Sequence, residues 1–223
     1  SKLNTVAIVP IKGESLRINN KFLLEYTLET LKQSNYINEV YIVTDNKKTA
    51  KIAKDFGAKV PILRPPELSE DYIESLEVAK FMLEKIEDSG VNPDLVCFLS
   101  ETYPFRTSNL IDEMIIRINK KGLDALIATR VETRSIWIEK ENDIKLVNNG
   151  FMPRGIKDTN AIMGLLGLCC LIHPAYLRGS NLLNSRYGFY QIKNGTSSLQ
   201  IRDKNDIMSL EKILQNWWET NYS

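Results

Sequence analysis

The segment at residues 10–21 combines the side chains that a phosphate-binding loop needs. It contains one glycine, one serine and three cations: Gly13, Ser15, Lys12, Arg17 and Lys21. Backbone N–H groups, a hydroxyl and fixed positive charge are the groups that hold a triphosphate. The glycines of a Walker A loop or of a dinucleotide-binding fingerprint are missing, so neither motif is present. Phosphate binding and an exposed loop with incidental lysines are both open interpretations.

Two later segments also mix hydroxyl and charged side chains. Residues 63–75 hold Arg64 after an expected strand and Ser75 among acids at an expected helix start. Taken alone, a proline-rich turn with acids that favour a helix N-terminus explains this segment more simply than a ligand does. Residues 99–107 lie at the end of another expected strand and combine hydroxyls, a carboxylate and a cation, among them Ser100, Thr102, Glu101 and Arg106. A ligand site and a loop with a helix N-cap suit them equally.

Strands and helices alternate through the first 131 residues, and this order decides where the three segments lie. Short apolar runs predict strands at 5–10, 39–45, 59–63, 95–99 and 125–131. Apolar residues at helical spacing predict helices at 23–34, 47–56, 71–88 and 108–119. Such alternation is typical of parallel βαβ units in a three-layer α/β/α fold with a mostly parallel sheet. Ligands of such sheets lie beyond the carboxyl ends of the strands, where all three segments fall.

The remaining residues are richer in short strands. These are expected at 136–138, 144–146, 162–172, 189–192 and 198–201. A last helix follows Asp203, a good N-cap residue. We therefore predict one domain over residues 1–223. Its core spans 1–131 and about 197–223, and a β-rich extension spans about 132–196.

Composition excludes several classes of function. The net charge of +1 excludes a broad basic surface for nucleic acid, although a local basic pocket is compatible with it. The longest apolar stretch, residues 162–172, is too short to cross a membrane. Three cysteines, Cys97, Cys169 and Cys170, match no disulfide framework or zinc motif, which favours a reducing, cytoplasmic location. The single histidine, His173, excludes chemistry that needs several.

The order of elements and the three segments resemble the acylneuraminate cytidylyltransferases (CMP-sialic acid synthetases). That family's opening motif A-R-x-G-S-K-G-(I/L)-x-x-K-N lies without a gap over I-K-G-E-S-L-R-I-N-N-K-F at residues 11–22. Its R-P-x-x-L-A-x-D corresponds to R-P-P-E-L-S-E-D at 64–71, and its L-Q-P-T-S-P-L-R to L-S-E-T-Y-P-F-R at 99–106. The resemblance covers residues 4–131 and is weak beyond them.

The resemblance implies a nucleotide-diphospho-sugar transferase fold and a transfer of CMP from CTP to a nonulosonic or related sugar acid, with release of pyrophosphate. It also implies Mg²⁺ and a homodimer formed through the β-rich extension. Charge and hydropathy predict no nucleic acid or membrane partner. Carried over by position, Lys21 becomes a catalytic residue. The nucleotide-binding set becomes Lys12, Gly13, Ser15, Lys21, Arg64 and Ser75, with Arg17 as a substitute for the loop lysine that Leu16 replaces. The substrate-binding set becomes Ser100, Thr102 and Arg106.

The departure from the family lies before the last helix. There the family carries the metal-binding acids I-D-I-D, whereas this chain has L-Q-I-R-D at 199–203, which places Gln200 and Arg202 at the acid positions. Neither residue suits Mg²⁺, which prefers carboxylate and water oxygens. Arg202 is therefore predicted as a catalytic residue that supplies charge in place of the metal. Asp203 is a candidate metal ligand if the strand slips by one residue, and an N-cap otherwise.

Two other functions stay open on these departures. Two successive family motifs both fall on Lys21, so the first loop lacks the family residues between them. The altered acid pair and this shortened first loop suit a catalytically impaired homologue that acts as a nucleotide-binding or partner subunit. Ser100 and Glu101, which stand where the family has Gln-Pro, suit a nucleotidyltransferase with a changed base or sugar.

Overall fold

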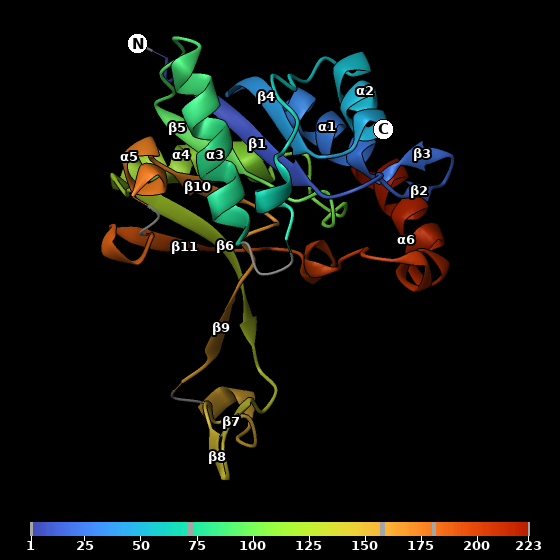
Figure 1. The fold of residues 1–223 in the computed structure, drawn as a ribbon. Coiled ribbons are helices and arrows are strands. Elements are labelled where there is room, and N and C mark those ends of the chain that lie inside the picture. Colours follow the sequence, from blue (N-terminus) through green and yellow to red (C-terminus); the bar gives the residue numbers. More distant parts are fainter. Residues whose placement is uncertain (1, 71–73, 157–158, 180–181, 223) are drawn as a thin grey trace.

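A mixed seven-stranded sheet forms the centre of the computed structural model, which describes residues 2–70, 74–156, 159–179 and 182–222 (Figure 1). The strand order is β11-β6-β10-β5-β1-β4, and β9 also pairs with β6. Five strands run in one direction, while β10 and β9 run against their neighbours β5 and β6. The strands are β1 (Thr5–Ile11), β4 (Ile37–Thr44), β5 (Leu95–Phe98), β6 (Ala125–Glu132), β9 (Ala161–Gly164), β10 (Cys170–Ile172) and β11 (Tyr187–Gln191). The predicted α/β class is confirmed.

Helices cover both faces of this sheet, because successive residues of a strand point to opposite sides. On β1, Ala7 and Val9 join one buried cluster with α1, α2 and α4, whereas Val6 and Ile8 join the other with α3 and α5. The sixth helix, α6, packs against the start of α1 through Leu214. The helices are α1 (Leu23–Gln33), α2 (Lys47–Asp55), α3 (Ser75–Asp88), α4 (Leu110–Lys121), α5 (Pro174–Arg178) and α6 (Lys204–Tyr222). None of the described helices is long and apolar enough to span a membrane.

Two of the predicted elements before residue 131 differ in the structure. The strand expected at 59–63 is reduced to a single bridge between Tyr41 and Lys59. Pro61 follows closely, and a proline lacks the N–H that would continue the ladder. The helix expected to begin at residue 71 begins at Ser75, and residues 71–73 lie outside the described part of the chain.

The strands expected after residue 131 divide between two places. The run at 162–172 is two strands, β9 and β10, with a turn between them rather than one continuous strand. β10 and β11 belong to the central sheet. The strand expected at 198–201 is replaced by the 3₁₀ turn η4 (Gly195–Ser198) and an extended segment. The other 3₁₀ turns are η1 (Pro66–Leu68), η2 (Arg154–Ile156) and η3 (Leu182–Asn184).

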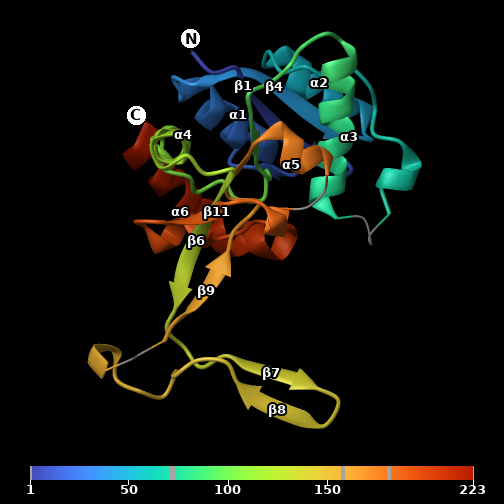
Figure 2. The same ribbon diagram turned by 90° about the vertical axis from the view of Figure 1, so that its left-hand side faces the viewer.

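Two short hairpins stand apart from the sheet. β7 (Trp137–Lys140) and β8 (Asp143–Leu146) pair with each other at the tip of an arm that projects from the body beyond β6 and β9 (Figures 1 and 2). β2 (Arg17–Ile18) and β3 (Lys21–Phe22) form a second hairpin after β1. Its turn residues, Asn19 and Asn20, have φ values of 52° and 63°, as a tight hairpin turn requires.

Candidate active site

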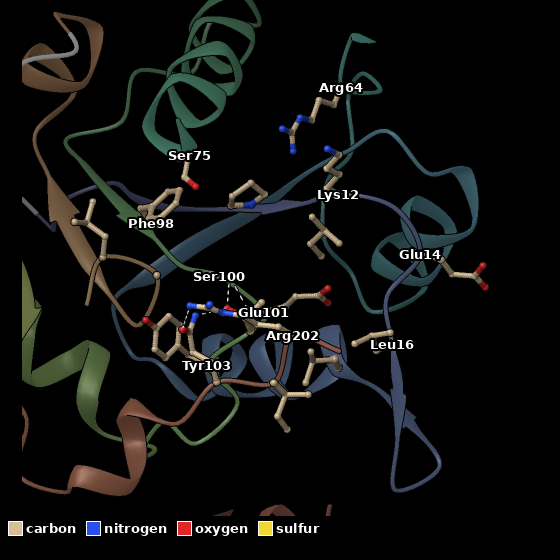
Figure 3. A pocket seen from close by; sticks show the side chains of 18 of the residues that line it. Lys12, Glu14, Leu16, Arg64, Ser75, Phe98, Ser100, Glu101, Tyr103 and Arg202 are labelled. Atoms are coloured by element: carbon tan, nitrogen blue, oxygen red, sulfur yellow. Dashed lines mark hydrogen bonds between the residues drawn. The ribbon is translucent and has the colours of Figure 1, made fainter. Parts of the chain in front are cut away.

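A cleft of about 640 Å³ opens at the carboxyl ends of β1 and β5 (Figure 3). These two strands are neighbours in the sheet, so the loops that follow them meet at one edge. The cleft brings together six residues that the sequence singled out from four separate segments: Lys12, Arg64, Ser75, Ser100, Thr102 and Arg202. The juxtaposition of cations and hydroxyls in one cavity suits an anionic, hydroxyl-bearing ligand.

Cations occupy one side of this cleft. Lys12 extends from the first loop, and Arg64 reaches in from the segment between α2 and η1 (Figure 3). Arg64 is 8% exposed, and burial lowers its pKa from the ordinary value. Its Nε donates to the carbonyl of Leu68 at 2.7 Å, which fixes the guanidinium plane beside the cleft. This side can therefore present two positive charges to a phosphate chain.

Hydroxyl and amide side chains form the opposite wall. The Oγ of Ser100 lies 2.8 Å from Thr102 Oγ1, which also accepts from Gln200 Nε2 at 3.1 Å. The backbone N–H of Ile201 donates to the Thr102 carbonyl at 2.9 Å, and this bond docks the C-terminal segment onto the cleft. Arg202 donates to the amide oxygen of Gln200. The two positions that carry acids in the family are thus bonded to each other here.

Gly13 and Ser15, predicted for nucleotide binding, lie behind the cleft surface. The Gly13 N–H donates to Asp45 Oδ1 at 2.8 Å, and its φ of 74° suits glycine. Ser15 is 3% exposed, and its Oγ donates to Glu101 Oε2 at 2.8 Å while it accepts from the Leu24 N–H at 3.1 Å. Both donors are paired with carboxylates, so here they shape the loop.

Arg17 and Lys21 also lie outside the cleft lining. Lys21 Nζ forms an ion pair with Glu29 at 3.1 Å and lies 5.2 Å from the centre of the Tyr26 ring. It lines a separate cavity of about 280 Å³ against α6. The guanidinium of Arg17 lies 4.7 Å from the Phe22 ring centre. Both cations lie in the β2–β3 hairpin, outside the lining of the cleft. A motif alignment gives the order of these residues but not the hairpin that separates them from Lys12.

Arg106 is buried beneath the cleft and does not line it. Its side chain is 0% exposed, and burial lowers its pKa. The guanidinium donates to one hydroxyl and three carbonyls: Thr27 Oγ1 at 2.9 Å, Leu168 O at 2.7 Å, Ser100 O at 2.7 Å and Gly167 O at 2.9 Å. Two of these carbonyls belong to residues of the cleft wall. Arg106 therefore positions that wall from behind.

Asp203 serves as the N-cap of α6. Its Oδ1 accepts from the Asp206 N–H at 2.9 Å, the bond that a cap residue makes three positions ahead. No group of three or more acidic, histidine or cysteine side chains suits a metal ion within the described residues. Mg²⁺ is commonly held by only one or two carboxylates together with substrate phosphates, and the carboxylates that line this cleft are Glu14, Glu70 and Glu101.

Two residues that shape the cleft were not among the predicted site residues. Glu101 lines it, and burial raises the pKa of its carboxyl to about 7, although the Ser15 hydrogen bond opposes that rise. The Ser-Glu pair in place of Gln-Pro was the signal. Gly167 packs so tightly that a Cβ would lie 2.8 Å from Tyr103 Cε2 and 3.0 Å from Ser100 Cβ. The glycines within the apolar run at 162–172 were its signal.

Comparison with solved structures identifies the fold. The structure is similar to CMP:2-keto-3-deoxy-manno-octonic acid synthetase complexed with CTP, with a TM-score of 0.66 and 12% identity over 97% of this chain and 99% of that chain. It is also similar to 4-diphosphocytidyl-2C-methyl-D-erythritol synthase from Anaerococcus prevotii, with a TM-score of 0.70 and 14% identity over 96% of this chain and 100% of that chain. The fold is that of these nucleotidyltransferases.

The chain belongs to the cytidylyltransferase family, whose pattern matches residues 11–150. It is 27% identical to the pseudaminic acid cytidylyltransferase of Campylobacter jejuni over 64% of this chain and 66% of that protein. It is 33% identical to the N-acylneuraminate cytidylyltransferase of Escherichia coli over 90% of this chain and 50% of that protein. The chain thus aligns with less than two thirds of the length of these relatives. The resemblance inferred from the motifs is confirmed.

Proposed function

We propose that this protein transfers CMP from CTP to a nonulosonic or related sugar acid and releases pyrophosphate. The observation that carries the proposal is the single cleft in which Lys12 and Arg64 face a wall of Ser100, Thr102 and Gln200. The cations suit the triphosphate, and the wall suits a polyhydroxylated acid. The named relatives, which act on pseudaminic and N-acylneuraminic acids, support the choice of substrate class.

The transfer is a substitution at phosphorus that depends on positioning and on charge stabilisation. A hydroxyl oxygen of the sugar acid attacks the α-phosphorus, and the bond from that phosphorus to the bridging oxygen breaks. Lys12 and Arg64 would neutralise the phosphates on one side. Arg202 would add charge from the C-terminal segment, where the family's acids are absent.

A homodimer and a cytoplasmic location belong to the same proposal. The arm exposes large apolar side chains that a second copy of the chain would cover, with Phe151 76% exposed and Ile144 58% exposed. All three cysteines are free thiols in the interior, which is compatible with a reducing compartment.

The test is pyrophosphate release from each of the four NTPs across a panel of sugar acids, with and without magnesium. We expect turnover with CTP and at least one nonulosonic acid. Turnover with only another NTP would instead support changed base specificity, which the Ser100-Glu101 pair suggests. No turnover together with a CTP-induced rise in Tm would favour an impaired, nucleotide-binding homologue, which the Gln200–Arg202 pair suggests.

A further inference from the structure

Glu101 is a carboxylate that lines the cleft from the end of β5. It lies between the first loop, which carries Lys12, and the C-terminal segment, which carries Arg202 (Figure 3). Its Oε2 accepts from Ser15 Oγ at 2.8 Å. Among the described residues the carboxylate accepts this one hydrogen bond, which leaves Oε1 for a ligand. Ser15 is itself fixed by the Leu24 N–H, which gives the carboxylate a defined orientation.

The surroundings of Glu101 bring the pKa of its carboxyl close to neutral pH. Burial raises its pKa to about 7, and the hydrogen bond from Ser15 lowers it by a smaller amount. Charged side chains of opposite signs line the same cleft from other segments, namely Lys12, Arg64, Glu70 and Arg202, while Glu14 stands at its border and points away (Figure 3). Tyr103 adds a titratable hydroxyl on the same wall as Arg202. A general base works best when its pKa lies close to the working pH.

We propose that Glu101 is the general base of the transfer, an inference that rests on the proposed function. The Glu101 carboxylate accepts the proton of the sugar-acid hydroxyl as that oxygen forms its bond to the α-phosphorus. The bond between the α-phosphorus and the oxygen bridging to the β-phosphorus breaks, and pyrophosphate leaves with the electron pair. Glu101 then releases the proton to water, so the protein returns to its starting state.

Substitution of Glu101 by glutamine tests this role with little change of shape. In E101Q the amide oxygen can still accept from Ser15, so the loop keeps its support. We expect kcat to fall by about 10²- to 10⁴-fold, the range for a lost general base. The rise in Tm caused by CTP should stay unchanged, because binding of the nucleotide does not use the proton acceptor.

The pH profile of kcat/KM separates this role from a structural one. Wild-type activity should rise with pH through an apparent pKa near 7, and E101Q should lack that limb. In Ser15→Ala the limb should move to higher pH, since the hydrogen bond that lowers the pKa is lost. The substrates titrate in the same way with every variant, so a difference between the pH profiles comes from the protein.

Glu14→Gln is the matched control, because Glu14 borders the same cleft but points away from it (Figure 3) and lies 3.7 Å from Lys48. Its kcat and pH profile should equal those of the wild type. If the wild type turns over and E101Q has the same kcat or keeps the acidic limb of the pH profile, the role of Glu101 is overturned while the proposed function stands. A tighter CTP complex or a raised magnesium requirement in E101Q with the limb intact would also overturn it. No turnover by the wild type would overturn this role and the proposed function together.

Discussion

Arg106 carries a buried positive charge whose hydrogen bonds all go to neutral oxygens of Thr27, Leu168, Ser100 and Gly167. Replacement by leucine would leave the Leu168 carbonyl without its donor, whereas the carbonyls of Ser100 and Gly167 would keep the N–H groups of Tyr103 and Ser100. An unsatisfied buried group costs about 1–3 kcal/mol, so we expect Arg106→Leu to lower the free energy of unfolding by about that amount. Urea unfolding followed by circular dichroism measures the change.

Arg202→Leu is the control for that measurement, because Arg202 is exposed and its side chain donates to Gln200 alone among the described residues. We expect a change within about 0.5 kcal/mol for this variant. An Arg106→Leu protein of wild-type stability but weakened sugar-acid binding would instead support the substrate contact predicted from the motif.

The two lysines of the first segment should differ in their effect on nucleotide binding. Lys12 lines the cleft, whereas Lys21 pairs with Glu29 in another cavity. We expect Lys12→Ala to weaken CTP binding by about 1–3 kcal/mol, the range for a charged hydrogen bond. Lys21→Ala should change it by less than about 0.5 kcal/mol. Calorimetric titration decides, and an equal loss in both variants would support the motif-based assignment of Lys21.

Sequence reasoning located the cleft because its residues follow strands that are adjacent in a parallel sheet. Lys12 and Ser100 come together by that rule alone. Sequence reasoning could not predict the hydrogen-bond partner of a given side chain. Ser15 bonds to Glu101, which lies 86 residues further along the chain, and only the packed structure specifies that pairing. A motif therefore identifies the residues of a site better than it identifies their hydrogen bonds.

At the scale of elements, periodicity predicted the strands and helices that alternate through residue 131. Periodicity gave the wrong number of strands where one apolar run forms two strands. Residues 162–172 are apolar throughout apart from glycine, and their hydropathy is the same whether the run is one strand or β9 and β10 with a turn. The turn has a function, because it brings Gly167 against Ser100, whose N–H donates to the Gly167 carbonyl at 2.7 Å.

The start of α6 gives a prediction that separates a cap from a metal ligand. Asp203 accepts from the Asp206 N–H, and asparagine caps helices as well as aspartate does. We expect Asp203→Ala to lower the free energy of unfolding by about 1 kcal/mol and Asp203→Asn to leave it unchanged. Both variants should keep the magnesium dependence of the wild type. Loss of turnover in Asp203→Asn, measured by pyrophosphate release, would instead support the prediction that Asp203 is a metal ligand.

At the scale of the whole molecule, the arm has one apolar face. In the β7–β8 hairpin, Trp137 pairs with Leu146 and Glu139 with Ile144, so Trp137, Ile144 and Leu146 lie on the same side. The Phe151 ring centre lies 6.1 Å from that of Trp137 and extends the face. The opposite side carries Ile138 beside charged residues.

This asymmetry supplies a matched pair of variants for the homodimer, since Ile144 and Ile138 are each 58% exposed. If a second copy covers the apolar face, a lysine at position 144 would bury an unpaired charge in the interface, which is costly. We expect Ile144→Lys to have the mass of one chain, 25.5 kDa, and Ile138→Lys to keep twice that mass. Light scattering coupled to size-exclusion chromatography measures both. If the Ile144→Lys monomer is as stable as the wild type, the arm acts in association rather than in folding. A wild-type protein that is monomeric at every concentration would contradict the homodimer.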